Sequence, residues 1–158
     1  MDKAVYVVQT VCNAVYLRGV RPHPDDTLEA FWTILRRTDG LGAGFIAAQV
    51  VADLKNTPNN PLTKARDWWT WAVPGPGSRR GVNRYFNLEV TAPITDDSWQ
   101  NALNVMIEEV QPLIMGTVGR LHAQDWQNVM CEYDKWKRAK YGEGRPRKHY
   151  NPETAYTV

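Results

Sequence analysis

Hydrophobic residues recur every three or four positions along most of the chain, which is the repeat of helices that bury one face. Glycine, proline and short polar clusters interrupt this repeat, and no alternating stretch of useful length indicates a strand. The expected helices are residues 2–18, a helix from a cap at Asp25 or Asp26 to Arg37, 43–54, 64–71, 79–88, a helix from a cap at Thr95 or Asp96 to Pro112, and 122–141. The pattern predicts an all-α chain forming a single helical domain.

The same spacing predicts which side of each helix faces the core. In the second helix these positions are Leu28, Phe31, Trp32 and Leu35. In the third they are Phe45, Ile46, Gln49, Val50 and Leu54. In the last helix they are Trp126, Val129, Met130, Tyr133 and Trp136, and the opposite face collects Gln124, Gln127, Asn128, Cys131, Lys135 and Arg138, with Glu132 and Asp134 at its margins.

Composition narrows the class of protein. The chain has 158 residues, 43% hydrophobic and 23% charged, as in an ordinary globular domain. Its N-terminus lacks the layout of a signal peptide, and no apolar run is long enough to cross a membrane. Cys12 and Cys131 lie far apart, so neither a zinc site nor a disulfide framework is indicated. We expect no metal, no membrane contact and a cytoplasmic location.

Charge is unevenly distributed although the net charge is only +2. Residues 133–150 hold seven lysines and arginines against two acids, which suits contact with a phosphate backbone. Residues 1–141 are expected to form the helical domain, and residues 142–158 a basic tail punctuated by proline and glycine. Arg145, Arg147 and Lys148 of this tail are candidate DNA contacts. The alternative is a charged tail that is merely solvated.

Two glycine-rich turns join expected helices. The first contains Gly40, Gly42 and Gly44, and the second is Val-Pro-Gly-Pro-Gly-Ser at residues 73–78. Glycines allow a close backbone approach, and the N-terminus of the next helix offers unpaired N–H groups to an anion. The second turn is followed by Arg79 and Arg80, cations that are unfavourable in a first helical turn unless an anion is present. Either turn can equally be a simple link between helices.

Polar residues of the last helix form the second candidate site. Carboxamides, acids and a thiol on one face can read a base edge, bind an amine or transfer protons. An ordinary exposed face is the alternative, and Cys131 can equally be an inert buried thiol. His122 is interpreted as the residue that starts the helix rather than as a catalyst.

Two long motifs together resemble a known family. DWWTWAVPGPGSRRGVNRYF, from Asp67, and DWQNVMCEYDKWKRAKYGEGRPRKHY, from Asp125, resemble the α-glutamyl/putrescinyl thymine pyrophosphorylase family. These phage amino acid:DNA transferases are related to helix-hairpin-helix DNA glycosylases, and the resemblance runs from about Phe31 to Tyr150. It implies a helix-hairpin-helix DNA-glycosylase-like fold and hypermodification of thymine in phage DNA.

The resemblance implies an activity and its partners. A hydroxymethyluracil DNA kinase first pyrophosphorylates 5-hydroxymethyluracil in DNA. The family protein then displaces pyrophosphate from 5-(pyrophosphoryloxymethyl)uracil with an amine or amino acid, and a C–N bond forms. DNA containing the modified uracil, the amine and the kinase are the implied partners, and no cofactor is implied.

The resemblance also suggests roles for residues. Pyrophosphate would contact Gly77, Ser78, Arg79, Arg80, Asn83 and Lys135. The catalytic candidates are Glu132, Asp134 or Asp125 as the base, Asn128 for the uracil edge or the amine, and Cys131 for transient addition to the ring. DNA would contact Gly40, Gly42, Gly44, Arg84, Arg138, Arg145, Arg147 and Lys148. Trp68, Trp69 and Trp71 would line a pocket for a flipped base or, by default, belong to the core.

Two other functions fit the same residues. One is a non-catalytic helix-hairpin-helix DNA-binding module. The other is a glycosylase-like base excision enzyme, which is disfavoured because Asp53 at the end of the third helix has no evident lysine partner of the glycosylase type.

Overall fold

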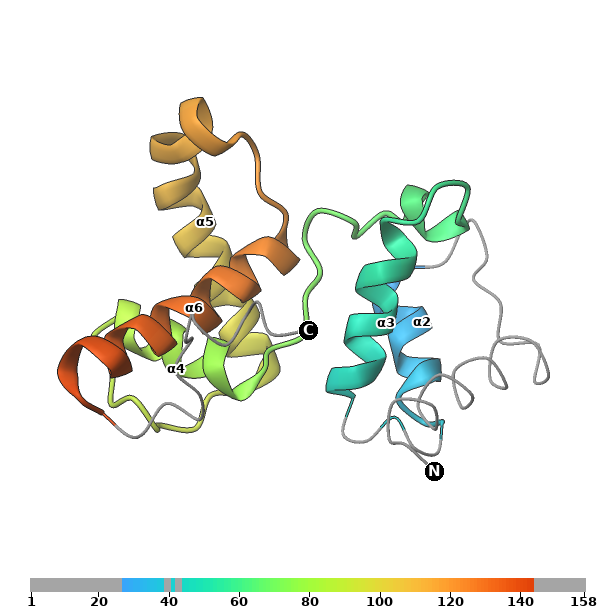
Figure 1. The fold of residues 1–158 in the computed structure, drawn as a ribbon. Coiled ribbons are helices and arrows are strands. Elements are labelled where there is room, and N and C mark those ends of the chain that lie inside the picture. Colours follow the sequence, from blue (N-terminus) through green and yellow to red (C-terminus); the bar gives the residue numbers. More distant parts are fainter. Residues whose placement is uncertain (1–26, 39–40, 42–43, 144–158) are drawn as a thin grey trace, which may run out of the picture.

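The structure is a computed structural model that describes residues 27–38, 41 and 44–143. Over these residues all regular structure is helical, which confirms the all-α prediction. The elements are α2 Leu28–Leu35, α3 Phe45–Lys55, the short 3₁₀ helix η2 Pro61–Lys64, α4 Pro76–Tyr85, α5 Asp96–Val118 and α6 Ala123–Tyr141 (Figure 1). The expected helix 2–18 lies outside the described residues.

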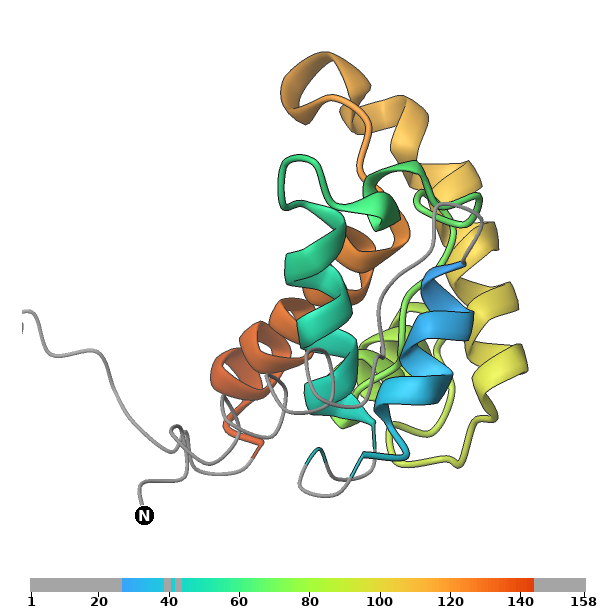
Figure 2. The same cartoon turned by 90° about the vertical axis from the view of Figure 1, so that its right-hand side faces the viewer.

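The helices pack as two groups, each with its own hydrophobic cluster. Helices α2, α3 and η2 bury the first cluster, and α4, α5 and α6 bury the second. Trp71 belongs to the first cluster and its neighbour Ala72 to the second, so the chain passes from one group to the other at this point. Figure 2, in which α2 and α3 face the viewer, shows α5 and α6 behind them.

Backbone hydrogen-bonding groups of the segment before α4 connect the two groups. The Trp69 carbonyl accepts a hydrogen bond of 2.9 Å from the N–H of Ala123, the first residue of α6. The carbonyl of Thr70 accepts one of 3.1 Å from the Gln100 side chain on α5. The link is therefore tied to both long helices of the second group.

Helix α2 starts from two side chains. Thr27 is its N-cap, and the hydroxyl accepts a hydrogen bond from the N–H of Ala30. The Asp67 carboxylate accepts bonds of 2.7 and 3.1 Å from the N–H groups of Leu28 and Glu29. The expected cap at Asp25 or Asp26 is wrong, because Thr27 occupies that position. The predicted buried face of this helix is confirmed.

The buried side of α3 differs in part from the predicted one. Its buried positions are Ala47, Ala48, Val51 and Lys55, and Phe45 is 50% exposed. Ile46, Val50 and Leu54 of the predicted side are partly buried and pack against the first cluster. Gly44 is the N-cap with φ of 96°, and its carbonyl accepts a hydrogen bond of 2.8 Å from the Trp32 indole. The small side chains of the alanines allow α3 to pack against α2. The spacing of the larger apolar residues did not predict this buried face.

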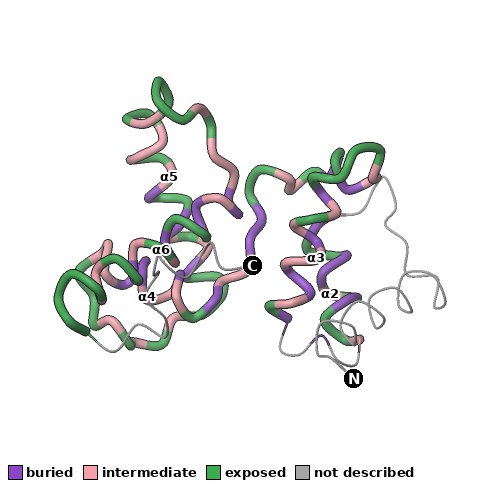
Figure 3. The backbone as a smooth tube through the Cα atoms, viewed as in Figure 1, coloured by how far each residue is buried: buried purple, intermediate pink, exposed green. Residues whose placement is uncertain are grey.

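Two predicted helix boundaries differ because of local hydrogen bonding. Residues 64–71 were expected to be helical, but they contain only the end of η2 and turns, one of them closed by the Trp71 N–H and the Asp67 carbonyl. Helix α5 continues through Pro112 to Val118. The Gln111 side chain bonds both the Gly119 carbonyl and the Leu121 N–H, which ties the end of α5 to the loop beyond it. Figure 3 shows that this end is largely exposed.

Helix α4 begins three residues earlier than predicted. Pro76 takes the first helical position, where the missing N–H of proline is harmless. Arg79 and Arg80 consequently lie in the second turn, so the prediction that they sit at the helix start is wrong. Helix α6 was predicted correctly, between the His122 N-cap and Gly142 with φ of 67°. No helix in the described part of the chain is long and apolar enough to cross a membrane.

Candidate functional site

Two glycines of α4 show how closely α4 packs against α6. A Cβ on Gly81 would lie 2.2 Å from the carbonyl oxygen of Met130, a distance too short for any side chain. A Cβ on Gly77 would lie 3.2 Å from the sulfur of Cys131. The two glycines are one helical turn apart and face α6. The Gly-Ser-Arg-Arg-Gly motif is therefore a helix-packing motif. The four-residue spacing of its two glycines is the sequence signal for this packing.

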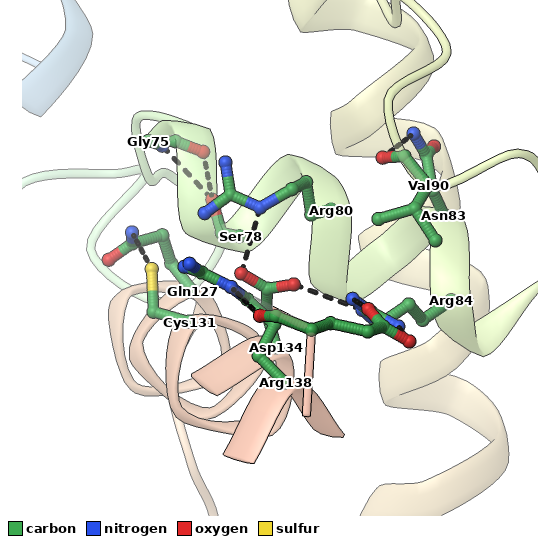
Figure 4. Close-up of polar contacts among 11 residues, drawn as sticks. Gly75, Ser78, Arg80, Asn83, Arg84, Val90, Gln127, Cys131, Asp134 and Arg138 are labelled. Atoms are coloured by element: carbon green, nitrogen blue, oxygen red, sulfur yellow. Dashed lines mark hydrogen bonds and ion pairs between the residues drawn. The ribbon is translucent and has the colours of Figure 1, made fainter. Parts of the chain in front are cut away.

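Asp134 is the centre of the polar contacts between the two helices (Figure 4). Its side chain is fully buried, and its two oxygens accept hydrogen bonds of 2.8 Å from Nε of Arg80 and 3.0 Å from Nε of Arg84. Arg84 also pairs with Glu143, and this bond raises the pKa of Arg84 and lowers the pKa of Glu143. Asp134, a candidate base, is thus held by two guanidinium groups of α4.

The start of α4 lies against the middle of α6. The buried Ser78 hydroxyl accepts a hydrogen bond from the Gly75 N–H and donates to the Gly75 carbonyl, both at 3.0 Å. The Cys131 thiol lies beside Ser78, and burial raises the pKa of this thiol. Gln127 donates from Nε2 to the Cys131 sulfur at 3.4 Å, while its buried Oε1 has no partner among the described residues. Ser78, Gln127 and Cys131 therefore form one polar cluster.

The expected pyrophosphate ligands do not all converge. Arg79 turns toward the loop after α4 and contacts the Ile94 carbonyl and the Asp96 carboxylate. Asn83 is buried and donates to the carbonyls of Val90 and Ala92 at 3.2 and 3.0 Å, so it fixes that loop. Arg80 faces Asp134, and Lys135 pairs with Glu132 on the surface. Of the expected set, Gly77 and Ser78 lie at the start of α4.

The remaining catalytic candidates are distributed along α6. Asp125 accepts a bond of 3.1 Å from the His122 N–H, and the Asp125 N–H donates to the His122 ring at 3.3 Å. This reciprocal cap confirms the interpretation of His122 as a helix-start residue, and burial lowers the pKa of His122. Asn128 and Glu132 are exposed, one turn apart, and Cys131 adjoins Glu132.

The candidate DNA contacts are only partly described. Gly40, Gly42, Arg145, Arg147 and Lys148 lie outside the described residues. Gly44 caps α3, and its carbonyl is taken by Trp32. Arg84 pairs with the Glu143 carboxylate near the end of α6, and Nε of Arg138 donates to the Glu143 backbone carbonyl at 3.1 Å.

The tryptophan cluster is partly core. Trp71 is buried, Trp68 is half-buried and Trp69 is 41% exposed. Trp68 contacts the ammonium group of Lys55 and the ring of His122, at centroid distances of 4.6 and 4.8 Å. Lys55 itself is buried and donates to the Trp68 carbonyl at 3.3 Å. Burial lowers the pKa of Lys55 to about 8. A lysine at the end of a helix is usually solvated, so the sequence carried no signal for this burial.

The predicted orientation of α6 is right at Trp126, Met130 and Tyr133 and wrong at other positions along the helix. Trp126 and Met130 are buried as expected, but Trp136 is 52% exposed. The polar residues Gln124, Gln127 and Asp134 are buried instead. The cause is the glycine face of α4, which packs against the polar side of α6 and supplies two arginines to Asp134.

Charge divides between the helices of the second group. Helices α4 and α6 together carry seven basic and three acidic residues, whereas α5 carries four acidic residues and no basic one. The described residues contain no group of three or more His, Cys, Asp or Glu side chains that could hold a metal ion. Helices α4 and α6 thus carry a net positive charge and pack beside an acidic helix.

Comparison with known protein families identifies a match. The family model for the 5-hmdU DNA kinase, helical domain, matches residues 5–145. No curated protein and no solved structure matches the chain.

Proposed function

The chain belongs to the family of 5-hmdU DNA kinase helical domains, and from this premise we propose that it binds DNA carrying 5-hydroxymethyluracil during modification of that base. The basic surface formed by α4 and α6 contacts the phosphate backbone. The observation that carries the proposal is the tight packing of these two helices, through the close contact at Gly81 and the ion pairs of Asp134. This packing brings the seven basic residues of α4 and α6 together.

Arg80 is suited to a phosphate contact. Asp134 occupies its Nε, and the side chain remains 32% exposed. Within the described residues its two terminal amino groups have no recorded partner, so they can donate to phosphate oxygens. A buried carboxylate that orients a partly exposed guanidinium pre-organises the contact, because less side-chain entropy is lost on binding.

A second and more specific function is favoured by the cluster at the start of α4. In this proposal the chain is an amine:DNA transferase that acts on the product of a hydroxymethyluracil DNA kinase. The amine nitrogen bonds to the methylene carbon at C5, the carbon–oxygen bond to pyrophosphate breaks, and pyrophosphate leaves with the electron pair. The exposed carboxylate of Glu132 takes the amine proton, and Asn128 and Gln127 hold the uracil or the amine.

Cys131 has a distinct place in the transferase proposal. Its raised pKa keeps the thiol protonated near neutral pH, so addition to the uracil ring requires a base at the moment of reaction. The partnerless Oε1 of Gln127 marks a polar position next to this thiol that a substrate donor can satisfy. In this proposal, the reaction therefore takes place at the cluster of Ser78, Gln127 and Cys131.

One experiment separates the functions. The full chain is titrated with duplex DNA containing 5-hydroxymethyluracil, and the same DNA is then incubated with the kinase, ATP, a pool of amines and amino acids, and the chain. Digestion to nucleosides and mass spectrometry identifies the product. A new amine-bearing nucleoside that depends on the chain supports the transferase.

The other outcomes are equally informative. DNA binding without a new nucleoside leaves a binding module and removes the transferase. Abasic sites favour base excision. Absence of binding to any DNA removes the proposed function altogether. Glu132→Gln is the matched active-site variant, because it removes the base while its pair with Lys135 lies on the surface and adds little to stability.

A further inference from the structure

The C-terminal half of α6 carries a partly exposed stripe of aromatic and basic residues. The stripe consists of Tyr133, Trp136, Lys137, Lys140 and Tyr141, each of which has another member three or four residues away on the same helix face. Trp136 is 52% exposed and Tyr141 is 57% exposed. Tyr133 is partly buried against the second hydrophobic cluster, and Trp136, Lys140 and Tyr141 are exposed. The buried side of α6, with Gln127, Met130 and Asp134, packs against α4.

The rings and ammonium groups of the stripe contact one another. Tyr133 and Trp136 are stacked, with centroids 6.2 Å apart and planes at 23°. Lys137 lies 5.5 Å from the Tyr133 centroid and 5.7 Å from that of Trp136. Lys140 lies 4.8 Å from the Trp136 centroid. Among the described residues, neither lysine has a carboxylate within ion-pair distance, so both ammonium groups are held by rings rather than by acids.

The chemistry of the stripe selects an anionic ligand with flat apolar faces. Exposed rings offer stacking surfaces, and the two lysines offer charge at the spacing of the rings. An apolar protein partner would satisfy the rings but would bury the ammonium groups without a counter-charge, which is unfavourable. Duplex DNA would satisfy the lysines, but its base faces are already stacked. An unpaired DNA strand supplies both phosphates and free base faces.

We propose that this stripe is a stacking platform for an unpaired DNA strand, with a base on Trp136 and the adjacent phosphates on Lys137 and Lys140. The inference rests on the proposed function and names the form of DNA that the chain prefers. The α4–α6 surface around Arg80 contacts the backbone, and the stripe receives bases that have left the duplex. A base that is to be modified at C5 becomes accessible in that state.

The test compares two substitutions at one exposed position. Trp136→Leu keeps an apolar side chain but removes the ring system, whereas Trp136→Phe keeps a stacking face. Fluorescence anisotropy of the full chain measures binding to a labelled single strand of about 15 thymidines, a length within known single-strand site sizes. Far-UV circular dichroism checks that each variant remains helical.

We expect Trp136→Leu to weaken single-strand binding about tenfold and Trp136→Phe to retain most of it. Lys137→Gln with Lys140→Gln should weaken binding and flatten its salt dependence. Lys64→Gln with Arg66→Gln is the charge-matched control, because both residues are exposed and lie at or just after η2 in the other helix group. Quenching of tryptophan fluorescence by the bound strand should decrease in Trp136→Leu.

The failures of the two proposals are distinguishable. If the chain binds duplex DNA but Trp136→Leu binds the single strand as well as the parent does, the stripe is not a stacking platform and the proposed function stands. If the chain binds no DNA, both proposals fail. If vesicles of phosphatidylserine and phosphatidylcholine bind the chain through Trp136 while the single strand does not, the stripe is a membrane-surface contact and the inference is overturned.

Discussion

Gly81 of α4 lies against the backbone of Met130 of α6, so close that a Cβ would fall 2.2 Å from the carbonyl oxygen and 2.8 Å from the carbonyl carbon. Backbone atoms in the middle of two helices cannot retreat as a flexible side chain can. Substitution of Gly81 must therefore separate the helices that carry the buried Arg80–Asp134 and Arg84–Asp134 contacts. Packing and electrostatics of the candidate site depend on the same glycine.

We expect Gly81→Ala to lower the free energy of unfolding by about 1–3 kcal/mol, the range typical of overpacking. Urea denaturation followed by circular dichroism measures the change. Gly116→Ala is the matched control, because Gly116 also lies in a helix but a Cβ there meets nothing within 4 Å. The control should be neutral or more stable by about 0.5–1 kcal/mol. Equal effects of the two substitutions would show that α4 and α6 do not approach closely.

The Asp134 carboxylate gives a second prediction. Asp134→Ala removes the carboxylate that Arg80 and Arg84 share, which leaves Arg80 without an ion-pair partner among the described residues and Arg84 with Glu143 alone. The expected loss is about 2–3 kcal/mol, below the usual range for a fully buried pair because Arg80 is partly exposed to water. The exposed ion pair of Glu132 and Lys135 supplies the comparison. Lys135→Gln should change the free energy of unfolding by less than about 1 kcal/mol.

These contacts explain how far the sequence alone could reach. Helix α6 was predicted with correct ends because His122 and Gly142 are local signals that act within one turn of the helix. The start of α4 was also a local signal, since proline favours the first helical position, but the arginines obscured it. The orientation of α6 is not determined by local sequence signals. Asp134 is buried by arginines 50 and 54 residues earlier in the chain, and periodicity within one helix cannot reveal such partners.

The same reasoning applies to the candidate site. Side-chain types at the start of α4 and along α6 correctly directed attention to two helices that pack together, Gly77 beside Cys131. Sequence could not show that Arg79 and Asn83 would be used by the loop at residues 90–96. Tertiary structure decides which polar side chains bond to backbone carbonyls. A motif recognised from residue types alone therefore overestimates how many of its polar side chains are free to bind a ligand.

Lys55 provides a prediction about pH. Burial lowers the pKa of Lys55 from 10.5 to about 8 in the folded chain, and the unfolded chain retains the ordinary value. Between these two values the unfolded state binds more protons, so the free energy of unfolding should rise as pH increases from 8 toward 10. Below pH 8 the buried ammonium group lowers stability by a constant amount.

Lys55→Met isolates this contribution. The variant should be more stable than the parent at pH 7, and the difference should shrink as pH rises through 8 and beyond, because the parent loses its buried charge. Comparison of the two chains at each pH cancels the effect of Cys131, whose raised pKa acts in the opposite direction. Parallel stability curves for the parent and the variant would show that Lys55 stays solvated.

Arg80 and Arg79 are neighbours in sequence with different expected roles in DNA binding. Arg79 is occupied by the Ile94 carbonyl and the Asp96 carboxylate, whereas Asp134 takes only the Nε of Arg80. We expect Arg80→Gln to weaken duplex binding and to lower the slope of log Kd against log salt by about one, the loss of one phosphate contact. Arg79→Gln should leave that slope unchanged. Anisotropy titrations between low and physiological salt measure both slopes. If Arg79→Gln gives the larger change, its contacts with the loop break on binding DNA, and the phosphate contact belongs to Arg79 instead.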